Sequence, residues 1–389
     1  MNKRVNIHLL NIIIFLQGFV FYAPIATIYR ENRGISISQI FLIESIYMIW
    51  IIFLEIPWGV FADKFGYKRT LVLSNFMFLI SKIIFFKANS FSMFLLERLV
   101  LAIAISGLSG CDSTLLYLSL DKSDNSEKAF AKYAFFSNLG FLLGSLISTF
   151  IINISMDLAA FYTIIPYGLA FIISFFLKDV GVNKGKNIGI LKNIKAILKK
   201  RNILIFVVGM ALVTEVVQSI SVFLNQNIYI KSNVDVKYFG VLLVAIQIIS
   251  LFSVKSYKIT NKLGQMKSIL LLLVIILISS FILIFTNNFI IAFSGIALIS
   301  TSMDFISPIS LDIENNSITS IDRATVLSIY SMIGSIVSAA INPIIGFASS
   351  YSLEVGLVTC SILCLISILL IYLYKNRIKN EIGDIKWLQ

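Results

Sequence analysis

The chain of 389 residues alternates between long apolar stretches and short polar segments. A helix that crosses a bilayer needs about 20 mostly apolar residues, and twelve stretches meet that requirement. Within them polar and apolar positions do not alternate as they do in barrel strands, so we predict helices. The twelve predicted spans cover about residues 7–29, 38–62, 70–88, 91–119, 130–153, 157–177, 203–230, 238–256, 268–286, 288–311, 324–349 and 353–374.

The composition points to the same class of protein. Hydrophobic residues make up 58% of the chain and charged residues 13%, whereas soluble domains carry about 25% charged residues. The three cysteines, Cys111, Cys360 and Cys364, lie in apolar runs without the spacing of a disulfide framework or a metal site. The predicted fold class is therefore an all-α membrane protein with twelve transmembrane helices.

The distribution of basic residues predicts the orientation. If the N-terminus is cytoplasmic, 25 of the 32 Lys and Arg residues fall in inside segments and 5 in outside segments, with Lys82 and Arg98 inside spans. Inner segments of membrane proteins carry such an excess, so we predict a multi-pass protein with both termini cytoplasmic. The net charge of +12 then indicates anionic membrane lipid, and no nucleic acid, as its counterpart.

A polar stretch at residues 179–202 divides the spans into two groups of six. We predict an N-terminal six-helix bundle at residues 1–178 and a C-terminal bundle at 203–389 that ends in a short cytoplasmic tail. Between them, Ile188–Leu198 has apolar residues at helical spacing with lysines between. This linker is either an amphipathic helix on the inner leaflet or a solvated connection.

An internal repeat relates the two halves. The segment "GVFADKFGYKRTLVL" (59–73) aligns without gaps with "YKITNKLGQMKSILL" (257–271) at an offset of 198 residues. Asp63 then meets Asn261, and Gly66 meets Gly264. A weaker match pairs Gly140 with Gly334. Repeats of this kind predict two pseudo-symmetric bundles with a substrate site between them near mid-membrane.

The same segment resembles a known family signature. "GVFADKFGYKR" is similar to the loop between the second and third helices of the major facilitator superfamily, with its elements at Gly59, Asp63, Gly66, Lys68 and Arg69. The strings "LEIPWGVFADKFGYKRT", "SGLSGCDSTLLY" and "RATVLSIYSMIGS" resemble a bacterial branch of drug and metabolite exporters. The resemblance implies a monomeric transporter, not an enzyme, in the bacterial cytoplasmic membrane.

The signature loop has a physical rationale as a gate. Two bundles that rock against each other need contacts that break and re-form. Asp63 can pair with a basic side chain or face a helix N-terminus, while Gly66 permits a tight turn. Asn261 and Gly264 are the second copy of this gating loop. Alternatively, the basic cluster serves only to fix the topology.

Two departures from the exporter pattern bear on the direction of transport. Exporters of the superfamily carry a proline after paired glycines in the fifth helix, but Ser145 follows Gly144 here. In the fourth helix, Leu101 and Ala102 replace the Gln and Gly expected after Arg98. The glycines can then serve close helix packing instead. We expect export, with a nutrient importer or uniporter of the same fold as the alternative.

Carboxylates inside spans are the candidates for proton coupling, since burying an ionisable group in a membrane is costly and usually functional. Ranked by depth and polar surroundings, the candidates are Glu215, Asp112, Glu44 and Asp304. Glu55 lies two turns before Asp63 and fits the gate. For each candidate a structural ion pair is the alternative, and Pro308 favours a helix break close to Asp304.

Polar and aromatic side chains on the spans are candidates for the substrate cavity, with packing against lipid or protein as the alternative for each. The exporter-like motifs and the buried carboxylates imply a small amphipathic drug-like or metabolite substrate. No Lys or Arg pair is evident at mid-membrane, which argues against organic anions. The cavity candidates are Gln17, Tyr22, Tyr47, Trp50, Arg98, Gln218, Gln226, Gln247 and Tyr330.

The energy source follows by exclusion. The chain has no Gly-rich phosphate-binding loop and a single histidine, His8, so neither ATP hydrolysis nor a metal hydrolase is predicted. The energy must then come from an ion gradient or from the substrate's own gradient. We expect no cofactor, and the buried carboxylates favour a proton gradient as the driving force of a secondary transporter. A receptor or assembly factor without transport is the alternative from another class.

Overall fold

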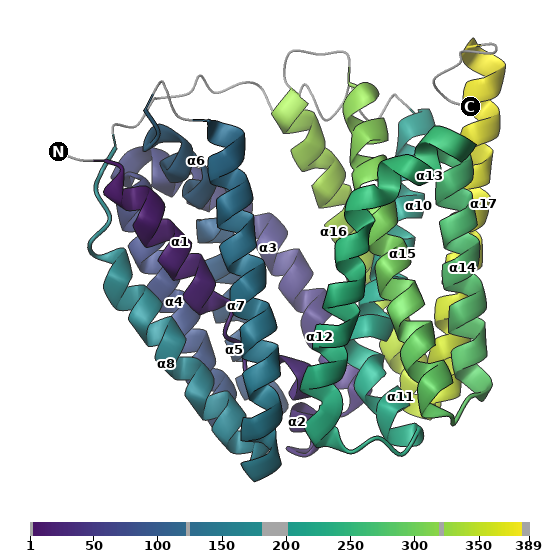
Figure 1. Ribbon diagram of the computed structural model, residues 1–389, viewed down its shortest axis with the longest axis horizontal. Helices are drawn as coiled ribbons and strands as arrows, with labels where there is room; N and C mark the ends of the chain where they lie inside the picture. The colour runs from purple at the N-terminus through teal and green to yellow at the C-terminus, as the bar shows by residue number, and fades with distance from the viewer. Residues whose placement is uncertain (1–2, 122–124, 181–200, 319–322, 383–389) are drawn as a thin grey trace. The chain divides into compact units, whose positions relative to one another are not determined.

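The computed structural model describes residues 3–121, 125–180, 201–318 and 323–382. These residues form helices joined by short loops, with no strand among them (Figure 1). Within them, 11 helical segments are long and apolar enough to cross a membrane, and Val5–Gln17 is a shorter apolar helix. The predicted all-α membrane fold is confirmed. Most of the predicted linker, including Ile188–Leu198, lies outside the described residues.

The chain divides into two compact units. Within the described ranges, the first contains residues 3–35, 46–180 and 236–244, and the second contains 36–45, 201–235 and 245–382. The long helix α3 (Ile37–Phe65) therefore contributes its first residues to the second unit and its remainder to the first.

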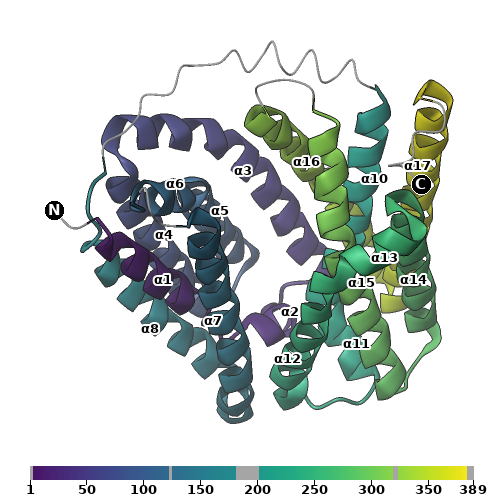
Figure 2. The same ribbon diagram turned by 45° about the horizontal axis from the view of Figure 1, so that its top comes forward.

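Figure 2 shows the helices from a second direction, coloured along the chain. Besides α3, the first unit contains α1 (Val5–Gln17), η1 (Ala23–Ile25), α2 (Ala26–Glu31), α4 (Tyr67–Lys87), α5 (Phe91–Leu108), α6 (Cys111–Leu118), α7 (Ser126–Ile154), α8 (Met156–Ser174) and η3 (Val236–Tyr238). The start of α12 (Phe239–Ser250) also belongs to it. The second unit contains the rest of α12 with α10 (Arg201–Gln218), η2 (Ser219–Leu224), α11 (Asn225–Lys231), η4 (Leu251–Lys255), α13 (Ser256–Leu263), α14 (Gln265–Phe285), α15 (Phe289–Asn316), α16 (Arg323–Tyr351) and α17 (Leu353–Ile382).

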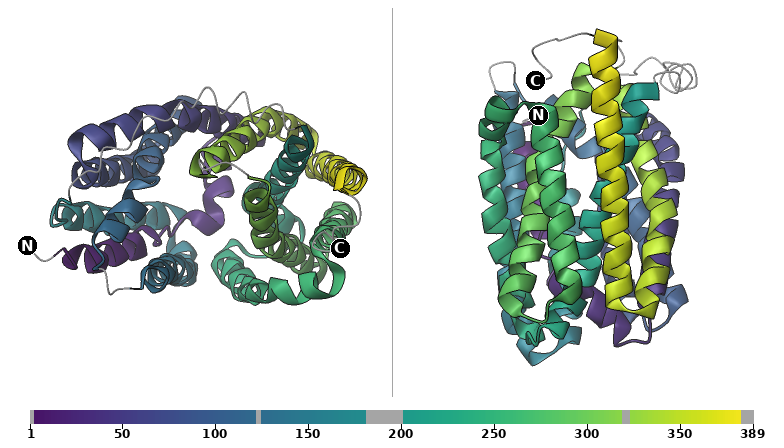
Figure 3. Two further views of the ribbon diagram at one scale, coloured as in Figure 1. Left: turned by 90° about the horizontal axis from the view of Figure 1, so that it is seen from above. Right: turned by 90° about the vertical axis from the view of Figure 1, so that its right-hand side faces the viewer.

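Each unit repeats one arrangement of helices. In the first unit, α1 packs against α7 and α8, and α4 packs against α5 and α8. In the second unit, α10 packs against α16 and α17, and α14 packs against α15 and α17. The end-on view of Figure 3 shows these helices lying side by side. The packing thus repeats helix for helix.

The repeat holds at single-residue precision over the third and fourth spans. Both ends of α4 and of α14 are separated by 198 residues, as are the starts of α5 and α15. Gly66 and Gly264 precede α4 and α14 with φ values of 88° and 79°. This conformation strongly favours glycine, so the same turn forms in both halves. The internal repeat that the sequence places around Gly66 and Gly264 is confirmed.

Two of the predicted spans are interrupted rather than continuous. The first helix stops at Gln17, and the chain becomes helical again only at Ala23. The fourth span breaks after Leu108, where Gly110 takes a φ of 74° before α6 begins. By contrast, Pro308 does not break α15, so the expected break near Asp304 is absent.

The paired glycines of the fifth span serve close packing. A Cβ atom on Gly140 would overlap the carbonyl oxygen of Phe15, and one on Gly144 would touch the backbone of Phe19. Helix α7 can approach the first span this closely because neither position has a side chain. This agrees with the packing interpretation of the pair.

Candidate functional site

Glu215 is completely buried and lies on α10, one turn before that helix ends. The chain continues as a π-helical segment, Ser219–Leu224, before α11 begins at Asn225. π-Helical segments are rare and occur frequently at functional sites. The wider turn changes the direction in which the side chains after the acid point.

Side chains from the π-helical segment and from α16 surround the Glu215 carboxyl group. Ser219 approaches it from the segment, and Ser338 and Asn342 approach it from α16. Among the described residues, neither carboxylate oxygen of Glu215 has a partner in hydrogen-bonding geometry, and the same is true of the Asn342 amide. The acid is therefore lined by groups that can hydrogen bond but are not locked into one network.

Glu44 belongs to the same unit and is 3% exposed. Its carboxylate interacts electrostatically with that of Glu215. The next residue, Ser45, donates a hydrogen bond to the carbonyl oxygen of Ala339 on α16. We call Glu44, Glu215, Ser219, Ser338 and Asn342 the acid cluster. It unites two of the four acids selected from the sequence, and their role in proton coupling stays a prediction.

The other two selected acids have different surroundings. Asp112, in the first unit, lies in the first turn of α6 and accepts hydrogen bonds from the Tyr133 hydroxyl (2.8 Å) and the Ser113 backbone N–H (2.6 Å). Asp304 is exposed on α15, with the Ser250 side chain nearby. Asp112 thus accepts hydrogen bonds in the way that acids in the first turn of a helix commonly do. Neither Asp112 nor Asp304 is as deeply buried as Glu215.

Among the cavity candidates, Gln17 has the most informative position. It precedes Glu215 by 198 residues, so the amide and the acid take equivalent places in the two repeats. Its amide group donates to Asn75 (2.9 Å), and its backbone carbonyl accepts from the Tyr167 hydroxyl (2.8 Å). The first repeat has a satisfied amide where the second has the buried acid.

The remaining candidates differ in exposure. Trp50 is 39% exposed, whereas Tyr22 and Tyr47 are buried in the first unit. In the second unit, Gln226 and Tyr330 are buried, Gln218 and Gln247 are half-buried, and the Tyr330 hydroxyl is 3.3 Å from that of Ser317.

A buried lysine occupies the interior of the first unit. Lys82 on α4 is 4% exposed and donates to the hydroxyl of Tyr22 (3.0 Å). Its ammonium group also lies 4.9 Å from the ring centre of Tyr167 and 5.6 Å from that of Tyr22. These distances are typical of cation–π contacts. The lysine is thus enclosed by two tyrosines.

A group of charged side chains lies in the same unit. The Glu97 carboxylate is 4.0 Å from the Arg30 guanidinium and 3.9 Å from that of Arg98. Glu97 and Arg30 are 1% and 2% exposed, and the Arg30 guanidinium lies 5.2 Å from the Phe85 ring centre. We call Tyr22, Arg30, Lys82, Glu97 and Tyr167 the charged cluster.

Sequence reasoning misses most of this cluster. It counts Arg30 in an outside segment and does not select Glu97 among the acids, yet both are buried. Glu97 lies directly beside Arg98 inside the fourth predicted span, and that position is a usable signal. Arg30 and Lys82 also place two buried cations in one unit, which the sequence argument against organic anions does not consider.

The gating loop joins α3 to α4. Gly59 and Asp63 are exposed on the last turns of α3, Gly66 forms the turn, and Lys68 and Arg69 begin α4. In the second copy, Asn261 is exposed on α13 and Gly264 forms the same turn. The turn geometry is shared, while the acid at position 63 has a neutral amide as its counterpart.

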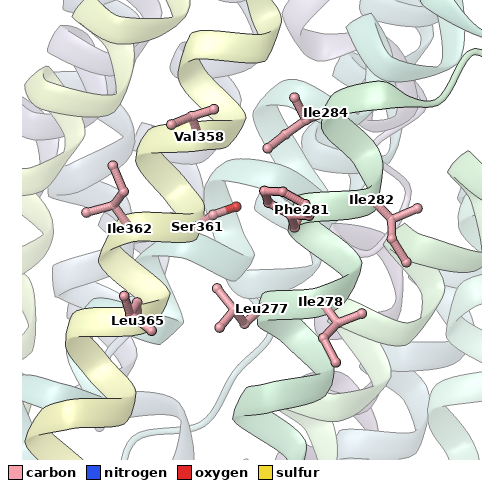
Figure 4. A pocket seen from close by; sticks show the side chains of 9 residues that line it. All are labelled: Leu277, Ile278, Phe281, Ile282, Ile284, Val358, Ser361, Ile362 and Leu365. Carbon is pink, nitrogen blue, oxygen red and sulfur yellow. The ribbon is translucent and has the colours of Figure 1, made fainter.

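Two open grooves on the units differ in chemistry from the buried clusters. One of about 480 Å³ lies beside Lys68 and Arg69, with Phe76, Phe171 and Phe175 among its walls. Another of about 440 Å³ lies between α14 and α17 (Figure 4), and Ser361 is the polar residue in its lining. The second groove contains no charged side chain, so it offers no group for proton transfer. It is lined by Leu277, Ile278, Phe281, Ile282, Ile284, Val358, Ser361, Ile362 and Leu365.

Comparison with known sequences gives one family and several distant relatives. The sequence model described as Major Facilitator Superfamily matches residues 7–342. The quinolone resistance protein NorA of Staphylococcus aureus is 25% identical over 177 residues, which are 46% of this chain and 45% of that protein. The chain thus matches about half the length of this relative. An uncharacterized MFS-type transporter of Bacillus subtilis, YxaM, is also 25% identical, over 48% of this chain and 49% of that protein.

Among solved structures, the nucleoside transporter NupG superposes with a TM-score of 0.80 at 14% identity. That match covers 97% of this chain and 100% of the other. At this level of identity the likeness concerns the fold.

Proposed function

Because this chain belongs to the major facilitator superfamily, whose members are transporters and not enzymes, we propose that it is a proton-coupled exporter of a small amphipathic compound. The observation that carries the proton coupling is the acid cluster. Glu215 is fully buried, and neither of its carboxylate oxygens has a hydrogen-bond partner among the described residues.

The energetics of burial supply the coupling mechanism. An ionised carboxylate without hydrogen bonds is costly in an interior surrounded by lipid, and binding a proton removes that charge. Glu44 adds electrostatic repulsion whenever both acids are ionised. Ser219 and Asn342 can donate hydrogen bonds to the carboxylate when it is ionised. Small rearrangements of these side chains then decide which protonation state is favoured.

Transport follows from linking protonation to the conformation. If the carrier closes around Glu215 only when that acid is protonated or when substrate fills the cavity, each cycle exchanges a proton for a substrate molecule. The π-helical segment after Glu215 connects the acid to Gln226 on α11, a cavity candidate. The satisfied amide at Gln17 gives the first repeat no equivalent acid, so we assign the proton step to the second unit.

The direction and substrate class rest on sequence likeness. The exporter-like motifs favour export, and one relative is named for quinolone resistance. We further propose a monomer in a bacterial cytoplasmic membrane with both termini cytoplasmic, two bundles at residues 1–178 and 203–389, and a cytoplasmic linker between them. The excess of Lys and Arg in the inside segments supports this orientation.

Proteoliposomes test the proposal. Purified protein is reconstituted, a pH gradient is imposed, and uptake of a quinolone and a panel of fluorescent amphipathic dyes is measured. We expect accumulation of at least one compound, driven by an acidic interior and abolished by an ionophore. Glu215→Gln should lose at least ten-fold of this accumulation but keep exchange of the compound without a gradient. The matched control is Glu127→Gln, which changes an exposed acid on α7.

Each alternative has its own signature. Accumulation that requires the opposite gradient indicates an importer, and equilibration without dependence on the gradient indicates a uniporter. Absence of flux for the whole panel contradicts a transport function for these compounds. Accumulation by Glu215→Gln equal to that of the wild type overturns the assignment of the proton site.

A further inference from the structure

The charged cluster of the first unit has an unusual charge balance. Lys82 is 4% exposed, and its contacts are the Tyr22 hydroxyl and two aromatic rings. No carboxylate lies within ion-pair distance of it among the described residues. Burial of a cation without an anionic partner is strongly unfavourable. Glu97 acts electrostatically on both Tyr22 and Tyr167, but no carboxylate of the described residues pairs directly with the ammonium group, so the position can accept a further anion.

The internal repeat shows that the fold does not require this charge. At the offset of 198 residues, Lys82 on α4 corresponds to Ser280 on α14, and Glu97 on α5 corresponds to Gly295 on α15. Both helix pairs pack in the same way in their own units. One repeat thus forms this packing without charges, so their presence in the other indicates a role beyond folding.

The neighbours of Lys82 add positive charge and aromatic surface. Arg30, also buried, lies over the ring of Phe85, which stacks on Tyr22 at 3.8 Å between ring centres. Glu97 is the acid of the cluster, but its oxygens are 4.0 Å and 3.9 Å from guanidinium nitrogens, beyond hydrogen-bonding distance. The cluster thus combines excess positive charge with flat apolar faces.

We propose that Lys82 and Arg30 bind the carboxylate of the transported compound, with the rings of Tyr22 and Tyr167 against its adjoining aromatic part. This proposal rests on the proposed transport function and narrows its substrate class to amphipathic aromatic carboxylic acids, including zwitterions. The ammonium group supplies a point charge, and the Tyr22 hydroxyl orients it. The site is closed here, so the compound enters it when alternating access opens this unit.

A binding experiment tests this independently of transport. The probes are aromatic carboxylic acids, a quinolone among them, each paired with its methyl ester. The ester keeps the shape of the acid but loses its negative charge. Binding to the purified full-length protein in detergent is measured by tryptophan fluorescence at neutral pH. For at least one pair, the wild type should bind the acid ten-fold or more tightly than the ester.

Variants test which residues cause the tighter binding of the acid. Lys82→Met should bring the acid-to-ester ratio close to one by weakening the acid alone, and Lys82→Arg should retain most of the preference. Tyr22→Phe should reduce the ratio by a smaller factor. Lys87→Met, five residues further along α4 at an exposed position, is the control and should match the wild type.

Two results would overturn the proposal. One is an acid-to-ester affinity ratio near one for every pair in the wild type. This measurement needs no variant, so it does not depend on how well Lys82→Met folds. The other is an acid preference that survives Lys82→Met unchanged. If the protein prefers acids over esters but shows no proton-coupled transport, the proposed function alone is contradicted. If it shows proton-coupled transport but no preference for acids, this inference alone is contradicted.

Discussion

Arg33 offers a prediction whose magnitude can be worked out from the structure. Its guanidinium donates to the carbonyl oxygens of Phe86 (2.7 Å) and Ala88 (2.6 Å) at the end of α4, and it forms an ion pair with Asp157 (2.6 Å). The first two bonds satisfy carbonyls that have no partner within their own helix. Arg33 therefore joins the ends of α2 and α4 to the start of α8.

The two kinds of contact should differ in energy. Hydrogen bonds that involve a charged group contribute about 1.5–3 kcal/mol each when partly buried, and the Arg33 side chain is 20% exposed. The Asp157 side chain is 63% exposed, and such an ion pair contributes about 0.2–1 kcal/mol. Two such bonds sum to about 3–6 kcal/mol, but the Phe86 carbonyl also accepts from the Tyr29 hydroxyl (3.4 Å) and keeps that partner when Arg33 is replaced. We therefore expect Arg33→Met to lower the free energy of unfolding by about 2–4 kcal/mol, and Asp157→Asn by less than about 1 kcal/mol.

The assay is denaturant or thermal unfolding of the purified variants in one detergent, followed by intrinsic fluorescence. The second repeat supplies a matched comparison. Lys231 and Ile284 lie 198 residues after Arg33 and Phe86, and Lys231 donates to the Ile284 carbonyl (3.1 Å) and to Glu354 (2.7 Å). With one carbonyl contact instead of two, Lys231→Met should cost less than Arg33→Met. The reasoning is refuted if Asp157→Asn destabilises the protein as much as Arg33→Met does.

Two glycine pairs give further predictions, each checked by the same unfolding assay. Gly66→Ala should destabilise by about 1–3 kcal/mol because its φ of 88° disfavours a side chain, while Gly59→Ala, with open space around it inside α3, should stabilise slightly; equal effects would contradict the strain argument. Gly140→Ala should cost about 1–3 kcal/mol because the new methyl group overlaps the Phe15 backbone. Gly334→Ala, with open space, should not destabilise, and a loss there would show that local geometry is not the cause.

The apolar periodicity and the motif spacing contain most of the information about the fold. Each bilayer span must be apolar over its own length, so the spans can be read locally without knowing their neighbours. The offset of 198 residues between Gly66 and Gly264 predicts a repeated turn, and both glycines take the same conformation. The interruption after Gln17 is not predicted, because an apolar run remains apolar across a break in the helix.

The candidate site is only partly readable from the sequence. Glu215 stands out as an acid deep inside an apolar run, and it is fully buried. Its neighbours Ser338 and Asn342 come from α16, more than 120 residues away. Asp304, selected by the same rule of depth, is exposed. Depth along a helix can be counted from the sequence, but the direction in which a side chain points depends on which helices pack around it.

The sequence by itself determines that this chain is a helical membrane protein built from two repeats, because lipid imposes its requirement on each span separately. The tertiary structure alone decides which charges share an environment. Lys82 meets Tyr22 and Tyr167 from segments that lie 60 and 85 positions away in the chain. Electrostatic energies depend on distances in space and on burial, and neither quantity can be obtained from the sequence alone.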